Sequence, residues 1–374
     1  MMSEAHGGNV DASARRLGVT PAQLLDASAS LAPFGLPLPA RLLAFSAAMQ
    51  PYPDRQHQRL RRCIAALHSL EPEAVLPGNG AAELFTWAAR DAAEAGRSLL
   101  PQPGFADYQR ALRCWSAAIE TLRLSLHWGP AAPQPFISPL VRESPVVWIT
   151  NPHNPTGQLW SRTSLEPLLQ HFALVICDEA FLPLVPNGDA QSLIPWVRDY
   201  PNLVVIRSLT KLYGMAGLRL GYAVADPERL RRWAQWRDPW PINCVASAVT
   251  QDLLRSPLRY AVWCQRVQHW VAREGLWLHH HLEALPAIKP MPSAANYLLI
   301  RGELDGEPIS LQPLREALET RHRILLRDCR SFEGLDDSWL RIGYQNRRGN
   351  RRIIKAMQQE LPQALNSINT PASN

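Results

Sequence analysis

Lysine is the residue that this chain of 374 amino acids lacks most clearly. Only three of its 39 basic residues are lysines (Lys211, Lys289 and Lys355), so the other 36 are arginines. Because arginine supplies nearly all of the positive charge, a lysine that follows an apolar run needs a chemical explanation. Lys211 is such a residue, since it comes directly after VVIRSLT.

Other absences exclude whole classes of protein. No apolar run of 18 residues occurs and the first ten residues hold no apolar signal core, so neither a membrane span nor secretion is predicted. The six cysteines show no CxxC spacing, and we expect reduced thiols in a cytoplasmic protein without a metal site. The net charge of +6 is modest and no nucleic-acid-binding motif is present, which favours a small anionic substrate as the partner.

Short apolar runs rich in branched residues alternate with helical segments along the chain. They lie at 97–101, 118–126, 145–150, 173–180, 202–209 and 218–225. Runs of this kind indicate strands that are buried on both faces of a mostly parallel sheet. The sequence therefore predicts an α/β protein, and a second, smaller α/β unit begins near ANYLLIR at 295–301.

The order of the segments predicts how the chain is divided. We expect an N-terminal arm over 1–40 that joins the small domain and the active site, a large domain over 41–245, a small C-terminal domain over 246–366 and a disordered tail over 367–374. Within the arm, Thr20 before Pro21 predicts the start of a helix with Leu24 and Leu25 on its apolar face. A long helical region is expected over 243–283.

Three short motifs stand where apolar runs end: NPHNPTG at 151–157, ICDEAF at 176–181 and SLTKLYG at 208–214. They supply an amide in Asn154, a carboxylate in Asp178 and an amine in Lys211. Open α/β sheets bind ligands at the carboxyl ends of their strands, so these three groups are expected to meet at one edge of the sheet.

This set of groups is what pyridoxal 5′-phosphate (PLP) requires. Lys211 can hold the cofactor as a Schiff base, Asp178 can pair with the pyridinium nitrogen, and Asn154 can hydrogen-bond the ring hydroxyl. An unpaired carboxylate at the end of an apolar strand is costly, which also favours a cationic partner for Asp178. The sequence therefore predicts PLP as the cofactor, with these three residues as the catalytic set.

Neighbouring residues fit the phosphate and the ring of the cofactor. Hydroxyls and a guanidinium near Lys211 can make charge-assisted hydrogen bonds, and PGNGAAE at 77–83 offers backbone amides at a helix N-terminus. The predicted cofactor-binding residues are Gly80, Ala81, Ala82, Ser208, Thr210 and Arg219. Phe105 can stack on the pyridine face, and the alternative for Phe105 is a core aromatic.

Two arginines late in the chain are candidates for binding the substrate. Arg341, in SWLRIGY, can hold an α-carboxylate with both edges of its guanidinium fork. Arg327, in RILLRDC, can bind a second anionic group. An ordinary surface position is the alternative for Arg327, but its neighbours are apolar.

The motifs NPHNPTG, CDEAF and SLTKLYGMAGLRLGY, together with Arg341, resemble fold-type I PLP enzymes of the aspartate aminotransferase superfamily. The resemblance implies a sheet of the seven-stranded type in the large domain. Within the superfamily, HGGN at 6–9, LLDASASLAPFGLP, YPD at 52–54 and PGFADYQRAL look like the L-threonine-O-3-phosphate decarboxylases of cobalamin biosynthesis. Those enzymes convert O-phospho-L-threonine to (R)-1-amino-2-propanol O-2-phosphate.

The resemblance implies roles for further residues. His6, Gly7, Ser30 and Arg327 would bind the substrate, its phosphate in particular, while Asn154 and Arg341 would contact its carboxylate. Tyr52 would reach across the interface of a homodimer to the cofactor phosphate. Ser30 and Ala32 depart from the family's SANxNP pattern, which often has asparagines there, so the choice between O-phosphothreonine and O-phosphoserine stays open.

Alternative functions remain at this point, because the motifs do not determine which substrate bond breaks. An aminotransferase acting on histidinol phosphate or an aromatic amino acid would use the same Lys211, Asp178 and Arg219. Phe181 favours decarboxylation, since aminotransferases usually place there a tyrosine whose hydroxyl bonds the ring oxygen. A PLP-binding protein without turnover is the third interpretation.

Overall fold

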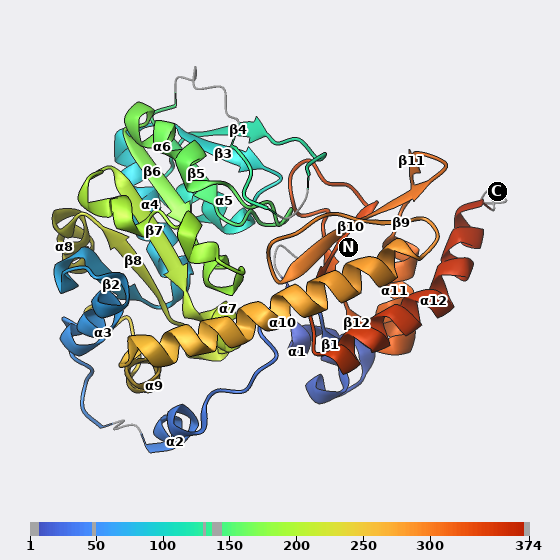
Figure 1. The fold of residues 1–374 in the computed structure, drawn as a ribbon, viewed down its shortest axis with the longest axis horizontal. Helices are drawn as coiled ribbons and strands as arrows, with labels where there is room; N and C mark the ends of the chain where they lie inside the picture. The colour runs from blue at the N-terminus through green and yellow to red at the C-terminus, as the bar shows by residue number, and fades with distance from the viewer. Residues whose placement is uncertain (1–6, 47–49, 130–131, 137–143, 370–374) are drawn as a thin grey trace.

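The computed structural model describes residues 7–46, 50–129, 132–136 and 144–369. A seven-stranded sheet and a smaller sheet form two parts of the molecule, and the long helix α10 (Pro257–Glu283) runs from one to the other (Figure 1). No helix within the described ranges is long and apolar enough to cross a membrane.

The large sheet has the strand order β2-β8-β7-β6-β5-β3-β4. Its strands are β2 (Val75–Gly78), β3 (Ser98–Gln102), β4 (Ile119–Arg123), β5 (Val146–Thr150), β6 (Leu174–Asp178), β7 (Leu203–Ser208) and β8 (Gly221–Ala225). Strand β8 runs opposite to the other six strands, which are all parallel to one another, so the prediction of a mostly parallel sheet is confirmed. Strand β2 was not predicted, because its sequence VLPG reads as the approach to a turn.

Helices cover both faces of this sheet, which explains why its inner strands are largely apolar. Successive side chains of a strand point to opposite faces. In β7, Val205 packs into the core on one face and Ile206 into the core on the other. One face is covered by α4 (Gly80–Ala95), α5 (Ala106–Arg113) and α8 (Pro227–Trp236), and the other by α3 (Gln58–His68), α6 (Arg162–His171), α9 (Cys244–Leu254) and α10.

The smaller part is built on an antiparallel sheet of order β11-β10-β14-β13, with β9 added to β10. Its elements are β9 (Ile288–Pro290), β10 (Tyr297–Leu304), β11 (Glu307–Pro308), α11 (Gln312–His322), β12 (Ile324–Leu325), β13 (Arg327–Asp328), β14 (Trp339–Gly343) and α12 (Arg347–Asn369). Helix α12 extends into the segment predicted as a tail over 367–374, and residues 370–374 lie outside the described ranges.

The N-terminal arm lies against the smaller part, as Figure 1 shows for α1 (Val10–Leu17) and β1 (Leu25–Asp26). The helix predicted from Thr20 is wrong: a single 3-10 turn (Pro21–Gln23) is followed by β1. Strand β1 pairs in parallel with β12. This long-range pairing provides hydrogen-bond partners for the backbone of Leu25 and Asp26. The local sequence pattern alone had placed these residues in a helix.

The helical region 243–283 is divided into α9 and α10 by Ser256 and Pro257. Pro257 occupies the first turn of α10, where its missing N–H costs nothing, and the Ser256 hydroxyl accepts from Arg259 N at 3.3 Å. Helix α9 packs against α2 (Leu38–Ser46) and α3, which belong to the large part. The predicted boundary between 245 and 246 therefore falls at the start of a helix that packs on the large part.

Candidate active site

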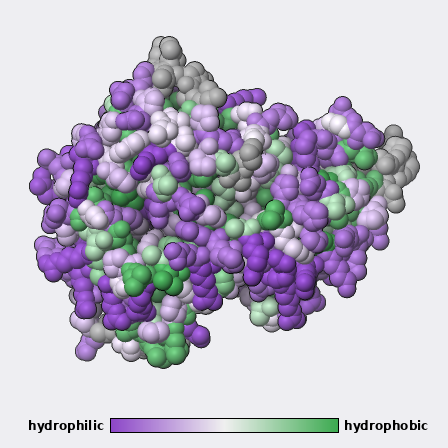
Figure 2. All heavy atoms as spheres, viewed as in Figure 1, coloured by the Kyte–Doolittle hydropathy of each residue, from purple (hydrophilic) through white to green (hydrophobic). Residues whose placement is uncertain are grey.

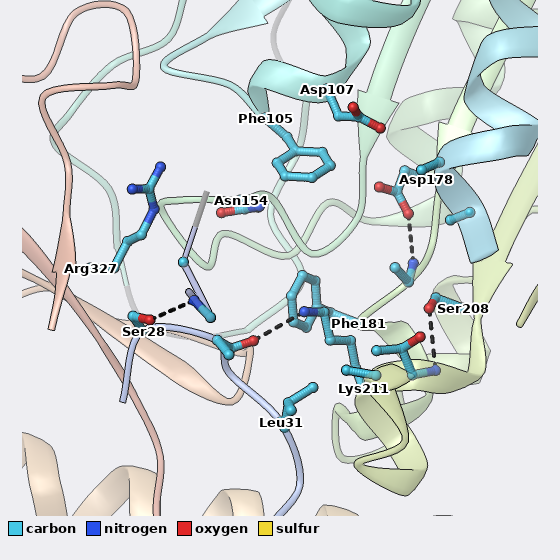
Figure 3. A pocket seen from close by; sticks show the side chains of 18 of the residues that line it. Ser28, Leu31, Phe105, Asp107, Asn154, Asp178, Phe181, Ser208, Lys211 and Arg327 are labelled. Carbon is cyan, nitrogen blue, oxygen red and sulfur yellow. Dashed lines mark hydrogen bonds between the residues drawn. The ribbon is translucent and has the colours of Figure 1, made fainter. Parts of the chain in front are cut away.

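A cavity of about 320 Å³ lies at the carboxyl ends of the large sheet, between that sheet, the arm and the smaller part. Most of the predicted site residues line it: Gly7, Ala81, Ala82, Phe105, Asn154, Asp178, Ser208, Thr210, Lys211, Arg219, Arg327 and Arg341. Figure 3 shows Phe105, Asn154, Asp178, Phe181 and Lys211 around one central space, with Arg327 on the opposite side of the view from Asp178.

Lys211 lies on α7 (Leu209–Tyr213), the short helix that follows β7. Its Nζ donates to Ala29 O of the arm at 3.0 Å and lies 5.5 Å from the centre of the Phe181 ring. Burial lowers the pKa of the Lys211 amine to about 8, and the positive charges of Arg341 and Arg219 act in the same direction. The amine is therefore largely uncharged at mildly alkaline pH, which is the form that can act as a nucleophile.

Asp178 ends β6 and is almost completely buried. Burial raises the pKa of its carboxyl group to about 6, while hydrogen bonds from Tyr108 and the Ala180 amide lower it. The Tyr108 hydroxyl donates to Asp178 Oδ2 at 2.6 Å, and Ala180 N donates to Oδ1 at 2.8 Å. Both oxygens are thus held in place, so the carboxylate has a fixed orientation at the wall of the cavity.

Tyr108 is a site residue that the sequence did not identify. It lies on α5, three residues after Phe105, and its hydroxyl also lies 2.8 Å from Thr150 Oγ1 at the end of β5. Its ring meets that of Phe105 edge to face, with the centroids 5.5 Å apart. The spacing PGFADY could have placed both aromatics on one side of a helix, but it holds no sign of Asp178 as the partner.

The predicted phosphate-binding residues gather at the start of α7. The Ser208 hydroxyl caps this helix by accepting from Thr210 N at 3.3 Å. The Thr210 hydroxyl is buried and has no partner within the described residues, which leaves it available to a ligand. Gly80 does not line the cavity itself, but a Cβ there would lie 2.4 Å from Arg219 Nη2. Glycine at position 80 therefore makes room for the Arg219 guanidinium.

Arg341 projects from β14 and is buried in the cavity wall. It donates to Asn154 Oδ1 and, through Nη2, to Ser28 O at 3.0 Å, and its guanidinium lies 4.7 Å from the centre of the Tyr297 ring. Its Nε is buried without a partner in the described part of the chain. An unpaired buried donor on a guanidinium is a place where a ligand carboxylate can bind.

Arg327 and the arm form the side of the cavity that faces away from Asp178 (Figure 3). The Arg327 guanidinium is buried, contacts Ser331 Oγ and lies 5.1 Å from the centre of the Phe332 ring. The bond from Arg341 Nη2 to Ser28 O attaches the arm to this wall, and within the arm Gly8 N donates to Ser28 Oγ at 2.8 Å. The contact of Ser28 with Arg341 was not predicted, because 313 positions separate the two residues.

Two predicted residues, Ser30 and Tyr52, lie away from the cavity wall. Ser30 is buried, and its carbonyl accepts from Asn296 Nδ2 at 2.9 Å. Tyr52 is 77% exposed and stacks on Trp240 at 4.4 Å. Neither Ser30 nor Tyr52 lines this cavity in the single chain. His6 lies outside the described residues.

The side chains around the cavity are of the kinds that PLP requires. A buried amine with a lowered pKa and an oriented carboxylate lie in the same cavity, as the imine and the pyridinium nitrogen require. The unpartnered Thr210 hydroxyl and the Arg219 guanidinium lie beside Lys211, where the phosphate group would bind. Lys211, Asp178, Thr210 and Arg219 are therefore the residues that would hold the cofactor.

Comparisons with known proteins agree with this chemistry. The aminotransferase class I and II family matches residues 40–357. A threonine-phosphate decarboxylase of Salmonella typhimurium is 34% identical over 373 residues, which cover 96% of this chain and 98% of that protein. A histidinol-phosphate aminotransferase of Symbiobacterium thermophilum is 32% identical over 336 residues, which cover 87% of each chain.

A solved structure shows the same fold. Histidinol-phosphate aminotransferase from Sinorhizobium meliloti, in complex with pyridoxal 5′-phosphate, aligns with a TM-score of 0.80 at 20% identity and covers 96% of this chain and 95% of that one. The fold-type I architecture expected from the motifs is thus confirmed. Because the family match spans most of the sequence and the decarboxylase is similar over nearly all of it, the chain belongs to the aminotransferase class I and II family.

Proposed function

We propose that this chain is a PLP-dependent carboxy-lyase that converts O-phospho-L-threonine to (R)-1-amino-2-propanol O-2-phosphate, for the nucleotide loop of cobalamin. The similarity to a threonine-phosphate decarboxylase over nearly the whole of both chains carries this proposal. The cavity supports it, because two buried arginines, Arg327 and Arg341, line the same space as Lys211. A substrate with a carboxylate and a phosphate provides an anionic group for each arginine.

The two arginines have different tasks in this proposal. Arg341, held by Asn154 and Ser28, binds the α-carboxylate, and Arg327 binds the phosphate at the other end of the substrate. Binding both ends fixes the rotation about the bond to the reacting carbon. The residues that bind the two ends of the substrate would therefore decide which bond at the α-carbon breaks, the bond to the carboxylate in a decarboxylase or the bond to hydrogen in an aminotransferase.

PLP, when bound, supplies an electron sink for the electron pair of the bond that breaks. Asp178 would keep the pyridine nitrogen protonated, because its two hydrogen bonds stabilise the ionised carboxylate. Lys211 would hold the cofactor through its Nζ, and the same amine, at the cavity wall, would carry a proton to the α-carbon of the substrate. The aromatic rings of Phe105 and Phe181 line the cavity and limit the access of water.

Product analysis tests the function directly. The PLP-loaded protein is incubated with O-phospho-L-threonine, with and without 2-oxoglutarate, and carbon dioxide, the amine phosphate and glutamate are followed by mass spectrometry. We expect carbon dioxide and aminopropanol phosphate whether or not the keto acid is present. Glutamate that appears only with the keto acid would identify an aminotransferase, the alternative favoured by the 32% identity to a histidinol-phosphate aminotransferase.

We also propose that the enzyme is a homodimer in which Tyr52 reaches the cofactor phosphate of the other subunit. Large apolar side chains are exposed on α2 and at the start of α10: Leu38, Leu42, Leu258 and Val262. Figure 2 shows apolar side chains gathered at the lower left, where Figure 1 places α2. Exposed apolar patches mark interaction surfaces.

Sedimentation should show a dimer, and Leu42→Glu should give a monomer. A monomeric parent protein would refute the interface.

The six cysteines support a location in the reducing cytoplasm. All six are free thiols, and three of them, Cys177, Cys264 and Cys329, are buried. Free buried thiols are usual in compartments where disulfides do not persist. Cell fractionation with an antibody against the chain tests this location.

A further inference from the structure

A buried ion pair lies directly beside two residues of the cofactor site. Glu179 follows Asp178, and Arg207 precedes Ser208. The side chains of Glu179 and Arg207 are 0% and 1% exposed. Neither residue lines the cavity, so neither can touch a ligand there.

Hydrogen bonds hold both partners of this pair in fixed positions. Arg207 Nε donates to Glu179 Oε2 at 2.8 Å, and the Ser192 hydroxyl donates to the same oxygen at 2.8 Å. Leu193 N donates to Glu179 Oε1 at 2.7 Å. The Arg207 Nη atoms donate to Asp189 at 3.1 and 3.2 Å. The pair therefore has the complete set of partners that buried charges need.

The pair joins two adjacent strands at the edge where the site is built. Strands β6 and β7 run in parallel, with Asp178 opposite Ile206, and Glu179 N donates to Ile206 O at 2.9 Å. Beyond this point the strands separate, β6 into the 3-10 turn Leu182–Leu184 and β7 into α7. The Glu179–Arg207 pair is thus a side-chain link between the two strand ends, next to Asp178 on one and Ser208 on the other.

We propose that the Glu179–Arg207 pair is a positioning element that sets the spacing between Asp178 and Ser208. This inference rests on the proposed function, in which Asp178 binds the ring nitrogen and the Ser208 segment binds the phosphate of one rigid cofactor. A rigid ligand with two anchors is bound well only when the anchors are held within about 0.5 Å of their best separation.

Stability alone is a poor explanation of such a pair. Buried ion pairs are often no more stabilising than apolar residues of the same volume, because both charges lose their hydration. The chain contains a second buried carboxylate that serves as a matched control. Glu274 is 0% exposed and accepts from Arg347 Nε at 2.9 Å and from Asn350 Nδ2 at 3.0 Å, and none of these three residues lines the cavity.

The test compares Glu179→Gln with Glu274→Gln in the full-length protein. Each variant is freed of cofactor and titrated with PLP, and the binding is followed by absorbance well below the melting temperature of all three proteins. We expect both substitutions to lower the melting temperature. Glu179→Gln should weaken PLP binding about tenfold, the lower end of what supporting residues contribute at other sites, and Glu274→Gln should leave it unchanged.

The outcomes separate this inference from the proposed function. If Glu179→Gln and Glu274→Gln lower the melting temperature alike and both keep the PLP affinity of the parent protein, the pair has no positioning role. If the parent protein itself does not bind PLP, the proposed function fails and this inference with it. Should Glu179→Gln not fold, Arg207→Lys provides the comparison, because it keeps the positive charge but loses the several N–H groups of the guanidinium. The inference then requires Arg207→Lys to bind PLP more weakly than the parent protein. An affinity equal to that of the parent would overturn it.

Discussion

Tyr108 and Asp178 lie 70 positions apart in the sequence, and their side chains meet in a hydrogen bond of 2.6 Å. This contact connects α5 to the end of β6, and Thr150 at the end of β5 is the second partner of the Tyr108 hydroxyl. Burial and the neighbouring Asp178 raise the pKa of Tyr108 well above its ordinary value. The hydroxyl therefore keeps its proton and serves as a permanent donor to the carboxylate.

Replacing Tyr108 by phenylalanine should move the acid limb of the pH–activity profile to higher pH. The hydrogen bond lowers the pKa of Asp178, which burial has raised to about 6, so its loss raises that pKa further. The carboxylate is then protonated at a higher pH and loses its attraction for the pyridinium nitrogen. The profile of kcat against pH measures the change. Tyr200→Phe, which removes a hydroxyl bonded to Glu166 on α6, is the control and should leave the profile in place.

The free energy of unfolding of the cofactor-free protein should fall as the pH rises from about 4 to about 6, because of Asp178. Its pKa is raised from 3.8 to about 6 in the folded chain, so in this window the folded state holds the proton that the unfolded state releases. The contribution is on the order of 3 kcal/mol across the window. Urea unfolding at a series of pH values measures it. Asp178→Asn should remove that part of the slope, and an unchanged slope would show that the carboxyl group titrates normally.

The attachment of PLP should accelerate as pH rises through about 8. Only the uncharged amine attacks, and burial lowers the pKa of Lys211 from 10.5 to about 8. Stopped-flow absorbance with the cofactor-free protein measures the rate. Lys211→Ala should abolish the covalent absorbance, and Lys355→Ala, at an exposed position, should not affect it. A midpoint near 10.5 would mean that the amine is fully hydrated.

Removing the guanidinium of Arg327 should weaken binding of O-phospho-L-threonine more than binding of threonine. A charge-assisted hydrogen bond contributes roughly 1.5–3 kcal/mol, so Arg327→Ala should cost about 10- to 100-fold in affinity for the phosphorylated ligand. The KM for O-phospho-L-threonine and the inhibition constant of threonine, measured with the PLP-loaded enzyme, compare the two ligands. Arg330→Ala, which breaks an exposed ion pair with Asp328, is the control. Equal losses for both ligands would remove Arg327 from phosphate binding.

A methyl group at Gly7 should displace the described start of the arm from Ser28, beside which it lines the cavity. A Cβ at this position would lie 2.4 Å from Ser28 O, closer than van der Waals contact permits. Gly7→Ala is therefore expected to raise the KM for the substrate while the affinity for PLP stays the same. Gly35→Ala, where a Cβ would meet nothing within 4 Å, is the control. An unchanged KM would show that the arm does not have to lie in this place.

The sequence predicted the parts of the site that depend on local patterns. Asp178 and Lys211 follow apolar runs, and parallel strands bring such positions to one edge of the sheet, so their meeting could be predicted from the residues. Six strands of the large sheet followed from the same patterns. Asn154 and Arg341 were also predicted, but their contact with each other was not, because the two residues are 187 positions apart.

The predictions failed or were incomplete where distant segments decide the structure. Strand β1 exists because β12 pairs with it, and two residues of local sequence contain no trace of that partner. Tyr108 has the pattern of a core aromatic until Asp178 is placed beside it. The pairing of Glu179 with Arg207 was not predicted, because the two residues are 28 positions apart and only their shared burial reveals the pair.

The bond from Lys211 Nζ to Ala29 O couples the arm to the state of the lysine. An imine nitrogen carries at most one hydrogen where an ammonium carries three, so covalent attachment of the cofactor would weaken the bond to the Ala29 carbonyl, whereas the backbone bond from Ala32 N to Lys211 O can persist. This side-chain contact between the arm and α7 would thus weaken when the cofactor binds and return when it leaves. The rate at which a protease cuts the first forty residues should then report how much of the enzyme is loaded.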